Sequence, residues 1–151
     1  MIQRSTMVDI LLLEDEAADA YLIKMAFKDY NLSVRLHHVL DGREGLNFLN
    51  RQEDYKNAPY PDLIFLDLNM PRMNGYEFLA EIKKDVRFKQ IPVIVLTTSD
   101  IEKDITYCYQ LGAASFITKP TGLDQFVSVI HKTVEYWMKI VCLPQRNEHE
   151  Y

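Results

Sequence analysis

The sequence predicts an α/β fold, a doubly wound five-stranded parallel sheet with helices on both faces. Five short apolar runs alternate along the chain with five amphipathic or polar stretches, the order of strands and crossover helices. The first run, at residues 8–13, is almost continuously apolar, as a strand is when both its faces are buried. Right-handed crossovers between such strands place helices on both faces of the sheet.

Each element follows from its local pattern. After the strand at 8–13, a helix is expected over 17–30, where Leu22, Met25 and Phe27 recur at helical spacing. Residues 34–40 are more polar and indicate an edge strand. Asp41 can cap a short helix over 41–50, and Gly112 can end a later one in the left-handed conformation. The remaining expected elements are strands over 63–66, 93–96 and 115–118 and helices over 76–84, 100–111 and 123–141.

Length and composition limit the class of protein. The chain has 151 residues, the size of one ordinary domain. A net charge of −5 argues against a nonspecific grip on nucleic acid, which needs clustered Lys and Arg. No apolar run approaches the roughly 18–20 residues of a membrane span, and Cys108 and Cys142 lie too far apart for a CxxC pair. We therefore expect no membrane or nucleic-acid partner, reduced cysteines and a cytoplasmic location.

Polar residues follow four of the expected strands. Glu14 and Asp15 follow the first, Asp67 the third, Thr97 the fourth and Lys119 the fifth. The carboxyl ends of parallel strands meet at one edge of the sheet, where ligands bind near the reversal of strand order. We expect these side chains to converge.

Such a cluster suits phosphoryl transfer to an aspartate. Two carboxylates ~4 Å apart repel by about 4 kcal/mol at an effective dielectric near 20, which favours a bound cation. Mg²⁺ prefers one or two carboxylates together with waters and phosphate oxygens. Lys119 and the Thr97 hydroxyl could each hold a phosphoryl oxygen.

Each of these residues, taken singly, also has a purely structural interpretation that does not involve phosphoryl transfer. A lone Asp after a strand is most often a turn or cap residue, and only the accompanying acids and Lys119 argue otherwise for Asp67. Thr97 alone would be an ordinary strand-end hydroxyl, and Phe116 alone could be core packing. Gly75 is expected to be a backbone device rather than a chemical group.

Four segments in order carry a family resemblance: LLLEDE (11–16), FLDLNMPRMNG (65–75), VIVLTTS (93–99) and GAASFITKP (112–120). On them the chain resembles the receiver domain of a two-component response regulator, which has a flavodoxin-like fold. The resemblance implies a receiver domain over 1–143, followed by a polar tail over 144–151 that we expect to be disordered. Only 31 residues follow Pro120, too few for a separate output domain, so we expect a stand-alone receiver.

The resemblance also implies site roles. Asp67 would accept a phosphoryl group from a kinase phosphohistidine or a small donor such as acetyl phosphate. Asp15 and Asp67 would bind Mg²⁺ directly, with the Asn69 main-chain carbonyl as a third ligand and Glu14 acting through a metal-bound water. Lys119, expected to precede a cis bond to Pro120, would bridge to the phosphoryl group.

A switch and an interface are implied as well. Thr97 would move toward the new anion, and Phe116 would follow, in the position where the family usually has tyrosine. Thr98 is larger than the residue many members carry there, which affects access and lifetime of the phosphoryl group. The last two helices carry more apolar residues than their core needs, so we expect a homodimer, with scattered surface aromatics as the alternative. The residues expected at its interface are Ile105, Tyr109, Val129 and Tyr136.

The function expected is that of a single-domain response regulator that switches a protein-interaction surface in a phosphorelay. It would phosphorylate and dephosphorylate only itself, so it is not expected to be a conventional enzyme. The stretch EDEAADAYLIKMAF (14–27) resembles regulators paired with phytochrome-type histidine kinases. Two alternatives stay open: a chemotaxis-like regulator that docks on a motor, and an interaction module that works without phosphorylation.

Overall fold

A five-stranded parallel sheet forms the centre of the protein. The structure, a computed structural model, describes residues 7–29 and 34–146, and the strands run in the order β2-β1-β3-β4-β5. The reversal of strand order lies between β1 and β3. The strands are β1 (Val8–Leu13), β2 (Val34–Val39), β3 (Leu63–Leu66), β4 (Val93–Thr97) and β5 (Ser115–Thr118).

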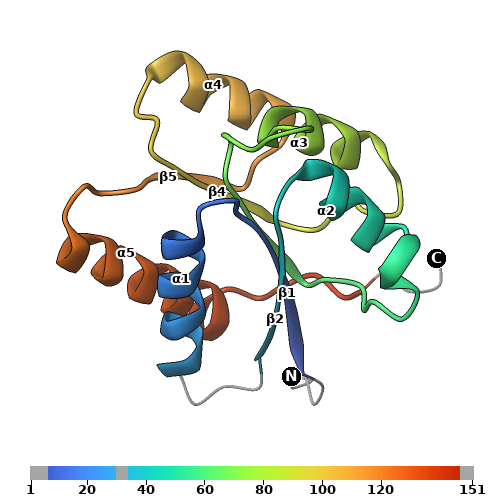
Figure 1. Cartoon of the computed structure of the whole chain (residues 1–151), viewed down its shortest axis with the longest axis horizontal. Coiled ribbons are helices and arrows are strands. Elements are labelled where there is room, and N and C mark those ends of the chain that lie inside the picture. Colours follow the sequence, from blue (N-terminus) through green and yellow to red (C-terminus); the bar gives the residue numbers. More distant parts are fainter. Residues whose placement is uncertain (1–6, 30–33, 147–151) are drawn as a thin grey trace.

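Helices cover both faces of this sheet, with α2, α3 and α4 on one side and α1 and α5 on the other (Figure 1). The predicted doubly wound α/β fold is therefore confirmed. None of the helices in the described ranges combines the length and the apolar character that crossing a bilayer requires. The helices are α1 (Ala17–Asp29), α2 (Gly42–Leu49), α3 (Gly75–Lys84), α4 (Glu102–Leu111) and α5 (Leu123–Glu135), with a 3₁₀ turn at Glu53–Tyr55.

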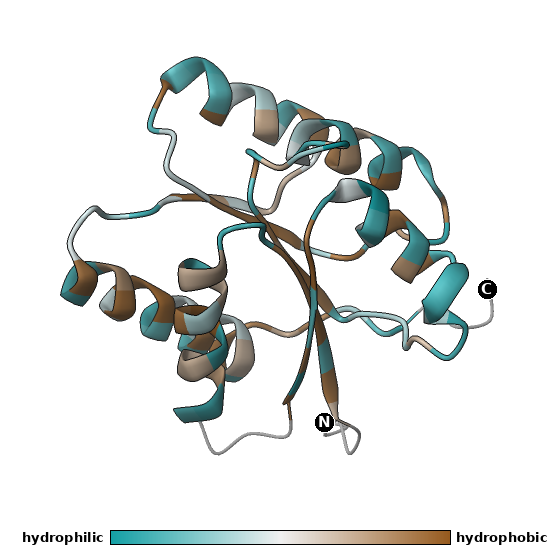
Figure 2. Cartoon of the chain, viewed as in Figure 1, coloured by the Kyte–Doolittle hydropathy of each residue, from teal (hydrophilic) through white to brown (hydrophobic). Residues whose placement is uncertain are grey.

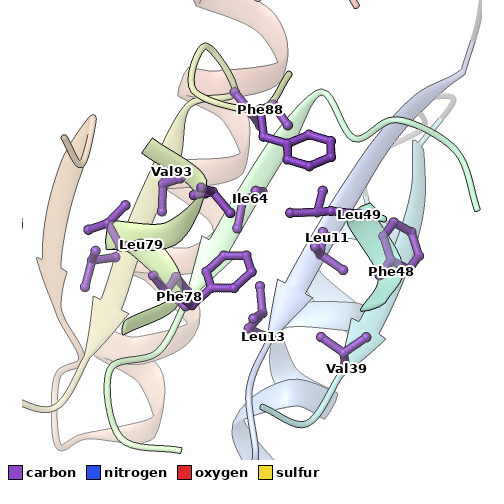
Figure 3. Close-up of a cluster of buried hydrophobic side chains, with 14 of the residues drawn as sticks. Leu11, Leu13, Val39, Phe48, Leu49, Ile64, Phe78, Leu79, Phe88 and Val93 are labelled. Carbon is purple, nitrogen blue, oxygen red and sulfur yellow. The ribbon is translucent and has the colours of Figure 1, made fainter. Parts of the chain in front are cut away.

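Alternate residues of the central strands feed two apolar clusters, and the strands run through the molecule as its most hydrophobic part (Figure 2). Leu11 and Leu13 face α2 and α3, whereas Ile10 and Leu12 face α1 and α5. In Figure 3, Phe78 of α3 points toward Leu13 in the first cluster. Burial on both faces explains why these strands read as unbroken apolar runs.

Most expected boundaries are confirmed to within one or two residues, although residue 30 at the end of the first helix lies outside the described part. Asp41 caps α2, its Oδ1 accepting from Glu44 N at 2.9 Å. Gly112 ends α4 with φ of 111°, as expected. The last helix differs, because α5 ends at Glu135 and continues as a π-helical turn, Tyr136–Ile140.

The start of the polar tail lies against the amino-terminal end of the sheet. The Arg146 guanidinium is 2.7 Å from Asp62 Oδ2 and 2.9 Å from Asp9 Oδ2, two carboxylates that are fully buried. The expected disorder does not hold for Arg146, because these ion pairs fix it. Residues 147–151 lie outside the described part of the chain.

Candidate functional site

The register of the sheet places the predicted site residues side by side. Leu13 of β1 pairs with Leu66 of β3, so Glu14 and Asp67 leave adjacent strands at the same level. The main-chain N–H of Asp67 donates to the Leu13 carbonyl at 3.0 Å. The acceptor expected from the sequence thus lies at the strand-order reversal, where an open α/β sheet forms its binding crevice.

Three carboxylates gather there. Oxygens of Glu14, Asp15 and Asp67 all lie within 4.8 Å of one another, with Glu14 and Asp67 buried and Asp15 exposed. Burial raises the pKa of Glu14 well above its ordinary value, and the hydrogen bond from Lys119 offsets only part of that rise. The site is short of positive charge, and its oxygen donors fit a hard divalent cation.

Lys119 supplies an ammonium group to this cluster. Its main-chain N–H donates to the Thr97 carbonyl at 2.6 Å, which sets the start of the side chain beside β4. Its Nζ is 2.6 Å from Glu14 Oε1, 2.8 Å from Asp19 Oδ2 and 4.0 Å from Asp67 Oδ2. Burial lowers the pKa of Lys119, but the hydrogen bonds to Asp19 and Glu14 outweigh it, so the pKa lies above its usual value. Lys119 therefore carries its charge in this site.

Asp19 was missed by the sequence reasoning. It lies in the first turn of α1, four residues after Asp15, and the only signal was an acidic residue in the helix that follows the first acidic pair. Its contact with Lys119 joins residues 100 positions apart. Such a contact depends on the packing of α1 against the sheet and cannot be read locally.

Thr97 ends β4 with its side chain fully buried. Its Oγ1 has no hydrogen-bond partner among the described residues. A buried hydroxyl without a partner is uncommon and costs free energy. The Thr97 hydroxyl could therefore donate a hydrogen bond to a group that enters the site. Thr98, the next residue, is exposed.

The loop after Asp67 is held by a close approach of α3. A Cβ on Gly75 would lie 2.4 Å from the Asp67 carbonyl oxygen, and the Gly75 N–H donates to the Leu68 carbonyl at 3.0 Å. Gly75 is thus the backbone device that the sequence indicated. Asn69 is exposed in this loop, two residues beyond Asp67.

Phe116 is partly buried on β5 and packs against the cluster beneath α3 and α4. Its main-chain N–H donates to the Tyr109 hydroxyl at 3.1 Å.

The expectation of a cis peptide bond between Lys119 and Pro120 is wrong. No peptide bond in the described ranges is cis, so this bond is trans.

The expected interface residues flank β5, the edge strand. Tyr109 on α4 and Tyr136 beyond α5 are 48% and 51% exposed, whereas Ile105 and Val129 are half-buried. The two helices lie on opposite faces of the sheet (Figure 1). Each therefore presents separate apolar surface beside the same strand.

Comparison with known proteins agrees with this geometry. A family model described as the response regulator receiver domain matches residues 10–131. The response regulator Rcp1 of Synechocystis sp. is 39% identical over 135 residues, which cover 89% of this chain and 92% of Rcp1. The Mn²⁺-bound structure of Rcp1 is 38% identical with a TM-score of 0.89, covering 91% of this chain and 99% of that one. The phosphorylated cyanobacterial phytochrome response regulator RcpA is 40% identical with a TM-score of 0.89, covering 93% of this chain and 100% of that one.

Proposed function

The chain belongs to the response regulator receiver family, and from that premise we propose that it takes a phosphoryl group from a histidine kinase onto Asp67. The single observation that carries this proposal is the arrangement around Asp67. Two further carboxylates lie within 4.8 Å, and Lys119 Nζ lies 4.0 Å away. No other cluster of three potential ligands of this kind was found among the described residues.

The transfer would run in line through a loose transition state. A carboxylate oxygen of Asp67 forms a bond to phosphorus, and the bond from phosphorus to the donor's imidazole nitrogen or acetate oxygen breaks. The leaving group keeps the electron pair. Water later attacks the acyl phosphate, which restores the carboxylate and releases inorganic phosphate. The protein is itself the species that is phosphorylated and dephosphorylated, and it turns over no separate metabolite, so it is not a conventional enzyme.

Residues of this chain would supply the positive charge and the donors. Glu14, Asp15 and Asp67, with the Asn69 carbonyl, would hold Mg²⁺, which neutralises charge on the phosphoryl oxygens when bound. Lys119, whose Nζ lies 4.0 Å from Asp67 Oδ2, would donate to a phosphoryl oxygen. The unpartnered Thr97 hydroxyl would donate to another oxygen, and Phe116 would follow that movement.

A phytochrome-type histidine kinase is the proposed partner. Support comes from the similarity to RcpA, a phytochrome response regulator, and from the length of the match, since this chain covers all of RcpA. Both cysteines are free thiols, as a reducing compartment such as the cytoplasm would keep them.

We propose that the protein passes on its signal as a homodimer. Exposed apolar side chains flank β5, and an apolar surface of this kind is typical of an interface. A second copy would cover it symmetrically. Sedimentation at micromolar concentration, with and without phosphorylation, tests this, and a monomer under both conditions would refute it. The exposed apolar side chains of α4, its N-cap and the π-helical turn after α5 include Ile101, Tyr107, Tyr109, Tyr136 and Ile140.

The two alternatives differ in output. A motor-docking regulator would bind a motor component only when phosphorylated. A phosphorylation-independent module would not need the acidic cluster, Thr97 and Lys119, all of which the structure brings together.

Intact mass after incubation with acetyl phosphate and Mg²⁺ tests the main proposal. The wild type should gain one phosphate, about 80 Da. The gain should be lost in EDTA and in Asp67→Asn. A wild type that stays unmodified with acetyl phosphate and with a phytochrome-type kinase would refute the proposal, while a gain that persists in Asp67→Asn would move the acceptor elsewhere.

A further inference from the structure

Asp19 contacts Lys119 of the candidate site from outside the acidic cluster. It lies in the first turn of α1, and its side chain is 23% exposed, whereas that of Lys119 is 4% exposed. The Asp19 Oδ2 accepts a hydrogen bond from Lys119 Nζ at 2.8 Å. None of the roles assigned above uses this residue.

The ammonium of Lys119 is held on the side of Asp19 and Glu14. These two acceptors lie at 2.8 and 2.6 Å, while the nearest Asp67 oxygen lies at 4.0 Å. An ammonium has three donors, and two of them are already engaged with carboxylates. The third donor is free, but the two short contacts hold Nζ nearer to Glu14 and Asp19 than to Asp67.

The two contacts do not respond alike to occupation of the site. Glu14 belongs to the acidic cluster, and a cation bound there would compete with Lys119 for its oxygens. Asp19 lies on the next helix, and its contact with Lys119 persists unless the lysine itself moves. The geometry points to Asp19 as a resting-state latch: it holds Lys119 away from Asp67 and so restrains phosphoryl transfer.

This inference rests on the proposed phosphorylation of Asp67 and makes Asp19 a positioning residue acting through Lys119. Loss of the Asp19 charge should leave Lys119 freer to approach the phosphoryl group and less neutralised by a neighbouring anion. Because an Asn can still accept a hydrogen bond and the pair is partly exposed, the expected gain is modest, about threefold.

The test measures the rate of phosphate gain by intact mass in acetyl phosphate and Mg²⁺. Asp19→Asn and Asp19→Ser should both gain phosphate about threefold faster than the wild type. Asp19→Glu, which keeps the charge, should stay close to the wild type. Glu16→Gln is the matched control, since it removes an exposed charge three residues away, and the hydrogen bonds and ion pairs of Lys119 within the described ranges do not include Glu16.

Misfolding cannot imitate the expected result, because a damaged site loses rate and does not gain it. Equal or slower phosphorylation of both Asp19 variants overturns the latch and leaves the proposed function standing. An equal acceleration in Glu16→Gln also overturns it, because removal of any nearby charge would then suffice. A wild type that takes no phosphate from any donor refutes the proposed function and this inference together.

Discussion

The hydroxyl of Tyr109 on α4 accepts a hydrogen bond from the main-chain N–H of Phe116 at 3.1 Å. This contact joins a residue of the expected interface to the expected switch residue. It also occupies a donor on the edge strand β5, where an unpaired N–H would otherwise invite pairing with another chain.

Replacing Tyr109 with Phe removes this acceptor and keeps the ring. The Phe116 amide should then exchange with solvent faster, because its partner on the sheet edge is gone, and stability should fall by about 0.5–1 kcal/mol. Amide exchange followed by NMR checks this. Tyr107→Phe, on the same helix with its ring stacked on Tyr76, is the control and should leave Phe116 unchanged. Unaltered exchange in Tyr109→Phe would show that the contact is not maintained in solution.

Thr97→Val should stabilise the unphosphorylated protein while impairing phosphorylation. The hydroxyl is fully buried and has no hydrogen-bond partner within residues 7–29 and 34–146, so an isosteric apolar side chain removes the cost of burying it, about 1 kcal/mol. Ser115 carries the second such hydroxyl, and Ser115→Ala is the matched control for the stability gain alone. Urea unfolding gives the stability and intact mass gives the phosphorylation. If both variants are phosphorylated like the wild type, Thr97 has no role in holding the phosphoryl group.

Arg146→Gln should destabilise the protein by about 1–3 kcal/mol at neutral pH, because it leaves two buried carboxylates with less compensation. The guanidinium bonds to Asp62 at 2.7 Å and to Asp9 at 2.9 Å. Chemical unfolding measures the loss, with Arg43→Gln, an exposed arginine of α2, as the control. A loss no larger than that of the control would mean that the ion pairs at this end of the chain do not contribute.

Asp9 should make stability sensitive to acid. Burial raises its pKa, but the hydrogen bonds from Arg35 and His37 and the nearby positive charges outweigh burial, so its pKa lies below the usual value. A carboxyl with a lowered folded-state pKa contributes stability above its unfolded pKa of about 3.9 and loses it as the pH falls through the folded value.

The measurement is unfolding free energy between about pH 6 and pH 2. The wild type should lose stability over the acid end of this range more steeply than Asp9→Asn, which has no proton to gain at that position. Parallel profiles would remove Asp9 from the acid response. Asp124→Asn, an exposed acid of α5, should follow the wild type and serves as the control.

The strands and most of the site were predictable because their signals are local. A strand buried on both faces must be apolar along its whole length, so residues 8–13, 63–66 and 93–96 were visible as runs. Once the strands are parallel, their carboxyl ends share one edge, which brings Asp67, Glu14 and Lys119 together by topology alone.

The features that the sequence did not predict depend on contacts between distant parts of the structure. The latch contact of Asp19, the ion pairs of Arg146 and the hydrogen bond of Tyr109 join segments that are remote in the chain or on different elements. The identity of a residue does not show which partner its side chain will contact. These contacts form only when the helices have packed on the sheet. The end of α5 at Glu135 also escaped prediction, because the apolar spacing continues past it.

The sequence by itself determined the order of strands and helices, the two-sided burial of the sheet and the residue types at its carboxyl edge, since each depends on hydrophobic pattern and chain order. The tertiary structure alone decided which carboxylates hold Lys119 and how far that lysine lies from Asp67. Those distances depend on where α1 rests against β2 and α5, which is set by packing across the whole molecule.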